Sequence, residues 1–394
     1  MTWSDMTALY LLDPETPGAA WAPFTAATPI SELRAAAWLQ HERWSRALGA
    51  SVAGLLAPHV AGPRPTGAIP LVTGDAIAGP CWVADATFAP KLPMRPVGGA
   101  KRLLHAGTAV AWRLDPGERW TGRHDAGDGL VVEGLPMRGT WDLLAALEQF
   151  LFTDTLAGLE GGSDPLPSGV IVMGNPEAIA VRGAEVEPGV VLDVRKGAIL
   201  LERGVQVRSG TRLEGPCWIG AGTQVQGGAL RHVSAGPQCR LHGEISTSVF
   251  LGHANKSHDG FLGHSVIGRW VNLGAGTITS NLKNTYGPVR LDIGAERLET
   301  GRTNLGSLIG DHVKTAIGTL LPTGAVLGTG ANLFGDPRAP KHVPAFAWGD
   351  GDTRLSLPAF LDVARRVMPR RDVPVDDAML AALTALYQRQ TPAG

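Results

Sequence analysis

The sequence predicts three parts in order: a mixed α/β domain over 1–168, a left-handed parallel β-helix of hexapeptide repeats over 169–349, and a short helical cap over 350–394. Three observations support this. The chain has 394 residues, more than the roughly 250–300 that one hydrophobic core usually supports. Aliphatic residues recur every six positions through its second half. The last segment carries two amphipathic patterns of helical period.

The N-terminal part shows the alternation of an α/β domain. Leu9–Asp13 is apolar enough for a buried strand. Ser31 is a good N-cap for a helix that would run to about Leu48, and a second helix is expected over Trp141–Leu159. Residues 161–169, GGSDPLPSG, have the composition of a linker between domains.

A six-residue period dominates the second half. It matches neither a helix nor one long strand, but it fits a chain that makes one flat side and one corner every six residues. Three sides then close a triangular coil, glycine supplies the corners, and stacked coils share an aliphatic core. The in-phase residues are Val207, Leu213, Ile219 and Val225, then Val233, Cys239, Ile245 and Leu251, then Phe261, Ile267, Leu273 and Thr279, and finally Ile309, Thr315, Leu321, Leu327 and Leu333.

The period slips in three places: Val225–Val233, Leu251–Phe261 and Thr279–Ile309. Extra residues in a rigid solenoid are expected to leave as loops, and such loops often gather on one face and carry a binding site. Two of the slips flank a polar segment at 253–289, which is therefore the candidate site.

Three features of this segment suit acyl transfer to an amine. His258 could take the proton of an attacking amine, because the pKa of histidine, about 6.5, suits a base near neutral pH. Asn272 and Asn281 offer amide donors and acceptors to a ligand. The turn formed by Gly274, Ala275 and Gly276 leaves room at a coil corner for a slim chain such as a pantetheine arm.

The stretch NLGAGTITSN, 272–281, resembles the signature of bifunctional bacterial enzymes that acetylate glucosamine-1-phosphate and then uridylylate it. His258 matches the position of that family's catalytic histidine. TGRTNLGSLIGDHVKTAIGT (300–319) and PKHVPAFAWG (340–349) resemble a divergent branch of sugar nucleotidyltransferases with a β-helix. The resemblance is specific from His253 to Gly349 and weak before about Gly169.

The resemblance implies a cytoplasmic transferase of UDP-N-acetylglucosamine biosynthesis. Acetyl-CoA would be the cosubstrate, and the acceptor an amino-sugar phosphate or nucleotide amino sugar. His258 would be the base and Asn272 would contact the sugar. Asn281 and the turn of Gly274, Ala275 and Gly276 would bind the coenzyme. The family's members act as homotrimers with sites between subunits, so the same assembly is expected here.

The chain departs from the family at three positions near the motif. Two tyrosines of the family are Phe261 and Leu282 here, and an expected lysine is Ser246. Replacement cations are available in Lys256, Lys283 and Arg269, of which the two lysines are predicted to contact substrate. The reaction class is therefore expected to persist with a changed acceptor.

The stretch PFTAATPISELR, 23–34, resembles the segment after the glycine-rich loop of sugar nucleotidyltransferases, which implies a Rossmann-like fold for the first domain. The phosphate-binding part is missing, because PETPGAAWA at 14–22 has one glycine and no cation. Thr28 stands where relatives carry arginine. We therefore expect a degenerate domain that binds a nucleotide sugar weakly or serves as a scaffold. Asp75 is either a turn residue or, if the domain is active, a ligand of Mg²⁺.

Two other functions remain open at this point. The chain could be a non-catalytic trimeric scaffold that binds sugar nucleotides, with Asn272 in an asparagine ladder and His258 inert. It could also be a zinc-dependent hydratase like the trimeric β-helix carbonic anhydrases, with His253, His258 and a third histidine, His232 or His242, on the metal. The preferred interpretation includes no metal in the β-helix.

Charge and cysteine content exclude several classes of partner. The formal net charge of -1 indicates neither nucleic acid nor an anionic membrane. The basic group Arg365, Arg366, Arg370 and Arg371 is interpreted as the solvated face and end of a helix. Three distant cysteines fit a reducing compartment such as the cytoplasm, and no signal peptide or membrane span is predicted.

Overall fold

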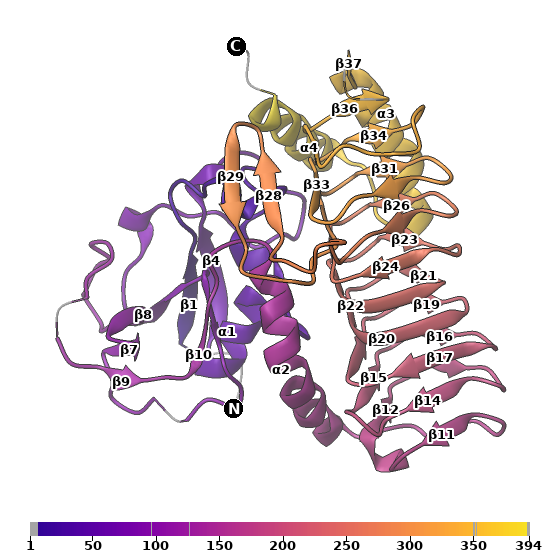
Figure 1. Cartoon of the computed structure of the whole chain (residues 1–394). Coiled ribbons are helices and arrows are strands. Elements are labelled where there is room, and N and C mark those ends of the chain that lie inside the picture. Colours follow the sequence, from indigo (N-terminus) through magenta and orange to yellow (C-terminus); the bar gives the residue numbers. More distant parts are fainter. Residues whose placement is uncertain (1–6, 96, 126, 350, 352, 392–394) are drawn as a thin grey trace.

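The computed structural model describes residues 7–391 except 96, 126, 350 and 352. An α/β domain, a parallel β-helix and two C-terminal helices follow one another along the chain (Figure 1), which confirms the predicted fold class. All three cysteines are buried free thiols. None of the described helices is both long and apolar enough to cross a membrane.

The N-terminal domain is built on a mixed sheet. Its strand order is β4-β1-β5-β8-β7-β9, in which β1 runs parallel to β4 and β5, and β8 runs antiparallel to β5. The strands are β1 (Ala8–Leu12), β4 (Ser51–Leu56), β5 (Cys81–Asp85), β7 (Arg102–His105), β8 (Thr108–Leu114) and β9 (Leu130–Val131). A second, two-stranded sheet pairs β6 (Phe88–Pro90) with β10 (Gly134–Pro136). Short 3-10 turns connect these elements at Ala19–Trp21, Pro58–Val60, Gly74–Ala76 and Leu159–Gly161.

Two helices accompany this sheet, and one differs from the prediction. The second, α2 (Asp142–Gly158), lies where it was expected. The first, α1, covers only Gln40–Leu48. Ser31 does not cap it. Instead the amide of Ser31 donates to the carboxylate of Asp13 at 3.1 Å within the 3-10 turn η3 (Ile30–Glu32), and a tight hairpin of β2 (Arg34–Ala35) and β3 (Trp38–Leu39) precedes α1.

The β-helix has three faces, each made of strands that stack in parallel. The first face carries β11 (Ile171–Met173), β14 (Val191–Asp193), β17 (Thr211–Glu214), the first halves of β20 (Gly228–Ala235) and β22 (Glu244–Phe250), β24 (Phe261–Gly263), β27 (Ile278–Thr279) and β32 (Leu320–Leu321). The second carries β12 (Ile179–Val181), β15 (Ile199–Leu201), β18 (Cys217–Ile219), the second halves of β20 and β22, β25 (Val266–Ile267), β30 (Ser307–Ile309), β33 (Ala325–Leu327) and β35 (His342–Val343).

The third face is the most regular, and its order is β13-β16-β19-β21-β23-β26-β31-β34-β36. Its strands are β13 (Glu185–Val186), β16 (Gln206–Val207), β19 (Gln224–Val225), β21 (Arg240–Leu241), β23 (Asn255–Lys256), β26 (Asn272–Leu273), β31 (Lys314–Thr315), β34 (Asn332–Leu333) and β36 (Ala347–Gly349). In each two-residue strand the first side chain points outward and the second inward. At the end of the solenoid β37 (Thr353–Arg354) pairs antiparallel with β36.

The predicted aliphatic series forms the core of the β-helix, with two errors of phase. Val207, Leu213 and Ile219 are fully buried in it. Leu251 packs toward the N-terminal domain instead, and Phe250 takes its place in the core. Phe261 is only half-buried, and Leu262 is the inward residue of its strand. The predicted six-residue series loses its register with the inward positions where the length of the coils changes.

Two of the three slips come from shorter coils, so the prediction that extra residues leave there as loops was wrong. Successive inward residues of the third face are 18 apart from Val207 to Val225, but 16 apart from Val225 to Leu241 and 15 from Leu241 to Lys256. In the short coils β20 and β22 each run through the corner between the first and second faces. A single residue of positive φ bends each strand there, His232 (φ 55°) and Thr247 (φ 45°).

The third slip does leave the solenoid, as predicted. Residues 281–305 project between the first and second faces and contain the hairpin of β28 (Arg290–Ile293) and β29 (Glu296–Glu299). Its apolar residues join the cluster that α2 forms with the second face. Arg302 pairs with Glu148 of α2 at 2.5 Å. The insertion therefore packs against the N-terminal domain.

The N-terminal domain covers the second face of the β-helix. Helix α2 lies between the N-terminal sheet and the solenoid (Figure 1), with Leu143 and Leu147 in one buried cluster with Val249 and Val266. The ring of His232, at the short corner, bonds to the carbonyl of Leu147 at 3.2 Å. The two halves of the chain thus share a continuous apolar core.

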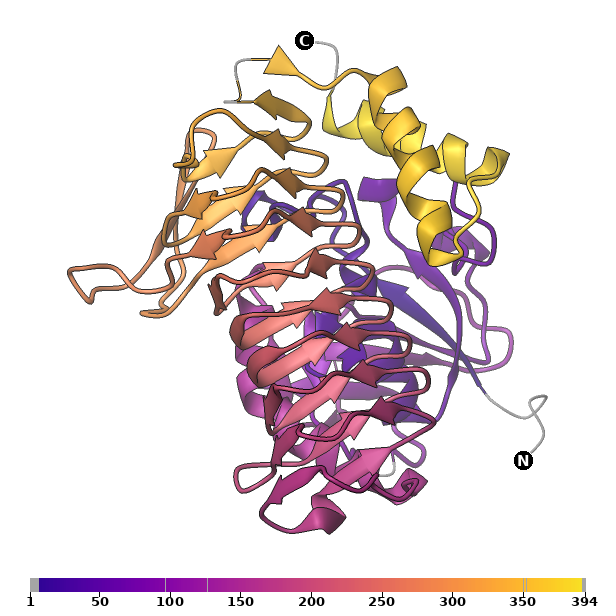
Figure 2. The same cartoon turned by 90° about the vertical axis from the view of Figure 1, so that its right-hand side faces the viewer.

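The C-terminal helices α3 (Leu357–Val367) and α4 (Asp377–Gln390) confirm the two predicted helices. They do not lie across the open end of the solenoid. They pack on Trp270 and Phe346, at the corner between the second and third faces, beside the last coils (Figure 2). Between them the 3-10 turn η8 (Met368–Arg371) approaches the third face.

Candidate functional site

His258 lies at the corner between the third and first faces, just after β23. Its side chain is exposed, and its ring forms no hydrogen bond to the part of the chain that the structure describes. Its backbone carbonyl accepts a hydrogen bond from the ammonium group of Lys256. The corner is thus fixed from inside the coil, while the imidazole remains available to a ligand.

The turn of Gly274, Ala275 and Gly276 stacks directly on this corner in the next coil. The amide of Gly276 donates to the carbonyl of Asp259 at 3.0 Å. A Cβ added to Gly274 would lie 2.5 Å from the backbone of Ala316 in the following coil, closer than real Cβ contacts, so glycine is required there. The turn therefore presents backbone rather than a bulky side chain beside His258.

Asn272 lies on the third face, next to the same corner. Its side-chain oxygen accepts a hydrogen bond of 2.6 Å from the amide of Asn255 in the coil below, and Ser257 donates to the oxygen of Asn255 at 2.5 Å. This is a short ladder, as the scaffold alternative expected. It also fixes the orientation of Asn272, so that its NH₂ group remains as a donor to a ligand.

Lys256 is not a surface cation. Its side chain is 1% exposed and occupies an inward position of the third face, between Leu241 and Leu273. Its ammonium group donates to the carbonyls of His242, at 3.3 Å, and His258. Burial lowers the pKa of Lys256 to about 8. Lys256 therefore supports the corner at His258. The prediction that it contacts substrate does not fit this buried position.

Asn281 and Lys283 lie at the other end of the first face. Strand β27 separates them from the turn of Gly274, and the amide of Asn281 bonds to the ring of His264 at 2.8 Å. Arg269 is also remote from His258, since its guanidinium donates to the carbonyl of Glu32 at 3.0 Å. Within one chain the structure brings together His258, Asn272 and the glycine turn, but not Asn281 or Lys283.

Sequence reasoning missed a cationic cavity next to Asn272. The cavity, of about 250 Å³, opens between the third face and η8. Its polar lining is His253, Asn255, Asn272, Lys314, Arg370 and Arg371. The two arginines had been assigned to a solvated helix end, but the packing of the C-terminal helices carries them to the β-helix. Of the three cations, only Lys314 could have been found from the sequence. It directly precedes Thr315, an inward residue of the six-residue series, and therefore occupies an outward position of its coil.

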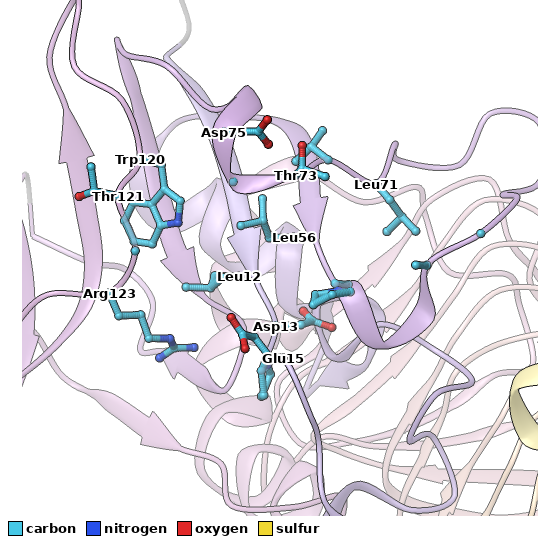
Figure 3. A pocket seen from close by; sticks show the side chains of 18 residues that line it. Leu12, Asp13, Glu15, Leu56, Leu71, Thr73, Asp75, Trp120, Thr121 and Arg123 are labelled. Atoms are coloured by element: carbon cyan, nitrogen blue, oxygen red, sulfur yellow. The ribbon is translucent and has the colours of Figure 1, made fainter.

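A larger cavity, of about 870 Å³, lies in the N-terminal domain, beside the carboxyl ends of β1 and β4. In parallel sheets ligands bind at this edge, where neighbouring connections leave in opposite directions. Leu12, Leu56 and Trp120 form apolar walls, and Glu15 and Arg123 also line the cavity (Figure 3).

The charges of this cavity do not suit a triphosphate. Arg123 forms an ion pair with Asp85. The carboxylate of Asp13 accepts from the amide of Ile30 at 2.6 Å and contacts His59 at 3.0 Å. Asp75 is exposed in a 3-10 turn, and a hydrogen bond from Thr73 lowers its pKa. No described lining residue offers a free lysine or arginine to a phosphate chain, as the missing loop predicted.

A metal-dependent mechanism finds little support in the geometry. Among the described residues, no three His, Cys, Asp or Glu side chains are grouped to hold a metal ion. His253 and His258 stand at opposite ends of β23, and the ring of His253 stacks on Trp270 with centroids 4.3 Å apart. Within one chain, the described histidines are therefore not grouped as a zinc site. Nor do Asp75 and its neighbours form a complete magnesium site.

No protein-family model matches the chain. A bifunctional sugar-1-phosphate nucleotidylyltransferase/acetyltransferase of Sulfurisphaera tokodaii is 34% identical over 91 residues, 23% of either protein. The bifunctional protein GlmU of Methanocaldococcus jannaschii is 35% identical over 86 residues, 22% of this chain and 21% of the relative. GlmU of a Cyanothece species is 24% identical over 164 residues, 41% of this chain and 32% of the relative.

The chain thus matches about a quarter of the length of the first two curated relatives, and about a third of the cyanobacterial one. The name of the Sulfurisphaera relative joins a nucleotidylyltransferase with an acetyltransferase. The exposed histidine, the adjoining asparagine and the glycine turn occupy one corner of the β-helix. Over these partial spans, the chain is similar to bifunctional sugar-1-phosphate nucleotidylyltransferase/acetyltransferases.

Proposed function

We propose that the β-helix transfers the acetyl group of acetyl-CoA to the nitrogen of an amino-sugar phosphate or nucleotide amino sugar. One observation carries this proposal: an exposed histidine stands beside a side-chain-free turn and a pre-oriented asparagine. A general base, an open track for the pantetheine arm and a donor for the sugar are the groups that this reaction needs.

The chemistry assigned to the residues is simple. The amine attacks the thioester carbonyl, a C–N bond forms, and the C–S bond breaks to release coenzyme A as its thiol. His258 accepts the proton that the nitrogen loses. Asn272 orients the sugar through its NH₂ group, and the backbone around Gly274, Ala275 and Gly276 lies along the coenzyme.

A homotrimer would complete the site. Asn281 and Lys283, predicted to bind the coenzyme and the substrate, lie at the far end of the first face from His258. A second copy whose Asn281 approaches this His258 would bring the two groups together. Apolar side chains that such a copy could cover are exposed on or beside the first face, among them Ile278 (42%), Leu320 (41%) and Ile317 (80%).

For the N-terminal domain we propose weak binding of a nucleotide sugar, or a supporting role, without nucleotidyl transfer. Its large cavity has apolar walls and carboxylates, and its arginine is paired. A nucleoside can stack on Trp120, but the phosphates of a nucleoside triphosphate would meet few cations. Mg²⁺ would be needed only if this domain were active. The wholly non-catalytic scaffold remains the second candidate, since it accounts for the asparagine ladder.

The test is thiol release from acetyl-CoA against a panel of amino-sugar phosphates and UDP-amino sugars. His258→Ala should lower the rate by about 10²–10⁴-fold with the preferred acceptor, as expected for loss of a general base. His124→Ala removes an exposed histidine of the N-terminal domain and should leave the rate unchanged. If no acceptor reacts, or if His258→Ala matches the wild type, the scaffold function takes the place of the acetyltransferase.

A further inference from the structure

The cavity on the third face collects cations without counter-charges. Lys314 of β31 and Arg370 and Arg371 of η8 line the cavity. Arg240 of β21 lies outside this lining but close enough to interact with the charge of Arg371. None of these four forms an ion pair with a carboxylate of the described residues. Among the residues that the structure describes, the ammonium group of Lys314 donates only to the carbonyl of His312, at 3.4 Å. Like charges that approach without a counter-ion oppose folding.

Burial, and for the two arginines also a neighbouring like charge, disfavours the charged state of Lys314, Arg371 and Arg240. Burial lowers the pKa of Lys314 to about 8. Burial and then the charge of Arg370 lower the pKa of Arg371, whose Nε is buried and has no hydrogen-bond partner. Burial and then Arg371 lower the pKa of Arg240. A bound anion would relieve each of these effects at once.

Two other polar groups in the cavity can donate hydrogen bonds. Asn272 uses its oxygen to accept from Asn255, which leaves its NH₂ group. His253 has a pKa lowered to about 4, first by burial and then by Arg269 and Arg371, so it is neutral at pH 7 and donates from one nitrogen. No carboxylate lines the cavity among the described residues. A cavity lined by donors and cations selects an acceptor-only, negatively charged group.

We infer that this cavity binds a phosphate group, held by Lys314, Arg370 and Arg371 together with the NH₂ group of Asn272. Two adjacent guanidinium groups match the geometry of phosphate oxygens, and an ammonium group adds a third charge. A volume of about 250 Å³ is several times that of one water molecule, about 30 Å³, so it can contain a phosphate group and part of its carrier.

Asn272 belongs both to this cavity and to the corner at His258. A ligand whose phosphate lies in the cavity would therefore extend its other end toward the imidazole. The carrier is either a sugar phosphate or the phosphorylated end of coenzyme A, and this part of the inference rests on the proposed function. The phosphate site itself rests only on the cations and donors described above.

The test is isothermal titration of the full chain with inorganic phosphate, glucosamine-1-phosphate, glucosamine, coenzyme A and 3′-dephospho-coenzyme A, without turnover. Lys314→Met and Arg371→Gln should each weaken the binding of phosphate ligands by about 10- to 100-fold, as expected for loss of a charged hydrogen bond. Arg366→Gln is the control, because it removes an exposed arginine of α3 that lies outside the cavity.

Loss of binding must be separated from loss of folding. Because each substitution removes an uncompensated cation, the variants without ligand should unfold at the same or a higher temperature than the wild type. Weaker phosphate binding together with undiminished stability supports the site. Wild-type affinity in both variants, or an equal loss in Arg366→Gln, overturns it.

The ligand panel identifies the carrier and separates this inference from the proposed function. If the variants lose affinity for glucosamine-1-phosphate but not for coenzyme A, the site holds the sugar phosphate. The reverse pattern, with weak binding of 3′-dephospho-coenzyme A to the wild type, assigns it to the coenzyme. His258→Ala should bind phosphate like the wild type. If acetyl transfer fails while the variants still lose phosphate binding, the site stands and the proposed function falls.

Discussion

Replacement of Lys256 by methionine tests whether a charge is buried inside the coil at His258. Methionine fills a similar volume, so the column between Leu241 and Leu273 should remain packed. Burial lowers the pKa of Lys256 from 10.5 to about 8. One pKa unit corresponds to about 1.4 kcal/mol. The difference between these two pKa values therefore corresponds to about 3 kcal/mol in the free energy of unfolding.

The sign follows from which state holds the proton. Below pH 8 the lysine is charged in both states, and the folded state carries the whole penalty of burying it. Between pH 8 and 10.5 the folded protein has released this proton while the unfolded chain retains it, so the stability of the wild type rises with pH. Lys256→Met lacks this proton. The free energy of unfolding of the wild type should therefore rise by about 3 kcal/mol relative to that of the variant over this pH range.

At pH 7.5 two effects of the substitution oppose each other. Removing the buried charge stabilises the variant by about 3 kcal/mol, whereas two carbonyls lose a donor at about 1 kcal/mol or more each. We expect Lys256→Met to be as stable as the wild type, or up to about 1 kcal/mol more stable.

Urea unfolding at pH 7.5 and pH 10.5 measures both quantities. Lys196→Met removes an exposed lysine of the β-helix and provides the control for general effects of alkaline pH. A difference between wild type and Lys256→Met that stays constant within about 1 kcal/mol across this range would refute the burial of the ammonium group.

Further predictions concern the corner at His258, the core of the β-helix and the N-terminal domain. Lys256→Met should lower kcat for acetyl transfer, because the carbonyl of His258 loses its donor, and should leave phosphate binding in calorimetry unchanged. Gly274→Ala should destabilise the fold by about 1–3 kcal/mol in urea unfolding, since its Cβ meets backbone; Gly18→Ala, with open space around it, is the control. Arg43→Ala should cost about 3–5 kcal/mol in the same assay, because it leaves the buried carboxylate of Asp154 unpaired.

The hexapeptide period predicted the β-helix because each coil repeats one local geometry. It lost the phase at Leu251 and Phe261, where the length of a coil depends on a corner residue of positive φ, Thr247, that no short pattern marks as a bend. The helix predicted from Ser31 failed for a related reason. Asp13, eighteen residues earlier, binds the amide of Ser31 and holds this segment in a turn.

The candidate site was predictable only where one stretch of sequence contains it. His258, Asn272 and the turn of Gly274 lie in consecutive coils at one corner, so the motif alone brought them together. The position of Arg371 depends on how the C-terminal helices pack, and that of Lys256 on which side of a two-residue strand faces inward. Neither is encoded in the local spacing.

Helix α2 packs on the second face of the β-helix, so neither half of this protein is expected to fold well without the other. Val249, Val266 and Leu308 on that face share one buried cluster with Leu143 and Leu147 of the N-terminal domain. A fragment that begins at the linker would expose these residues to water as a large apolar surface. Division of the chain into its two halves should therefore yield aggregates, and point substitutions in the intact chain are the way to assign a function to each half.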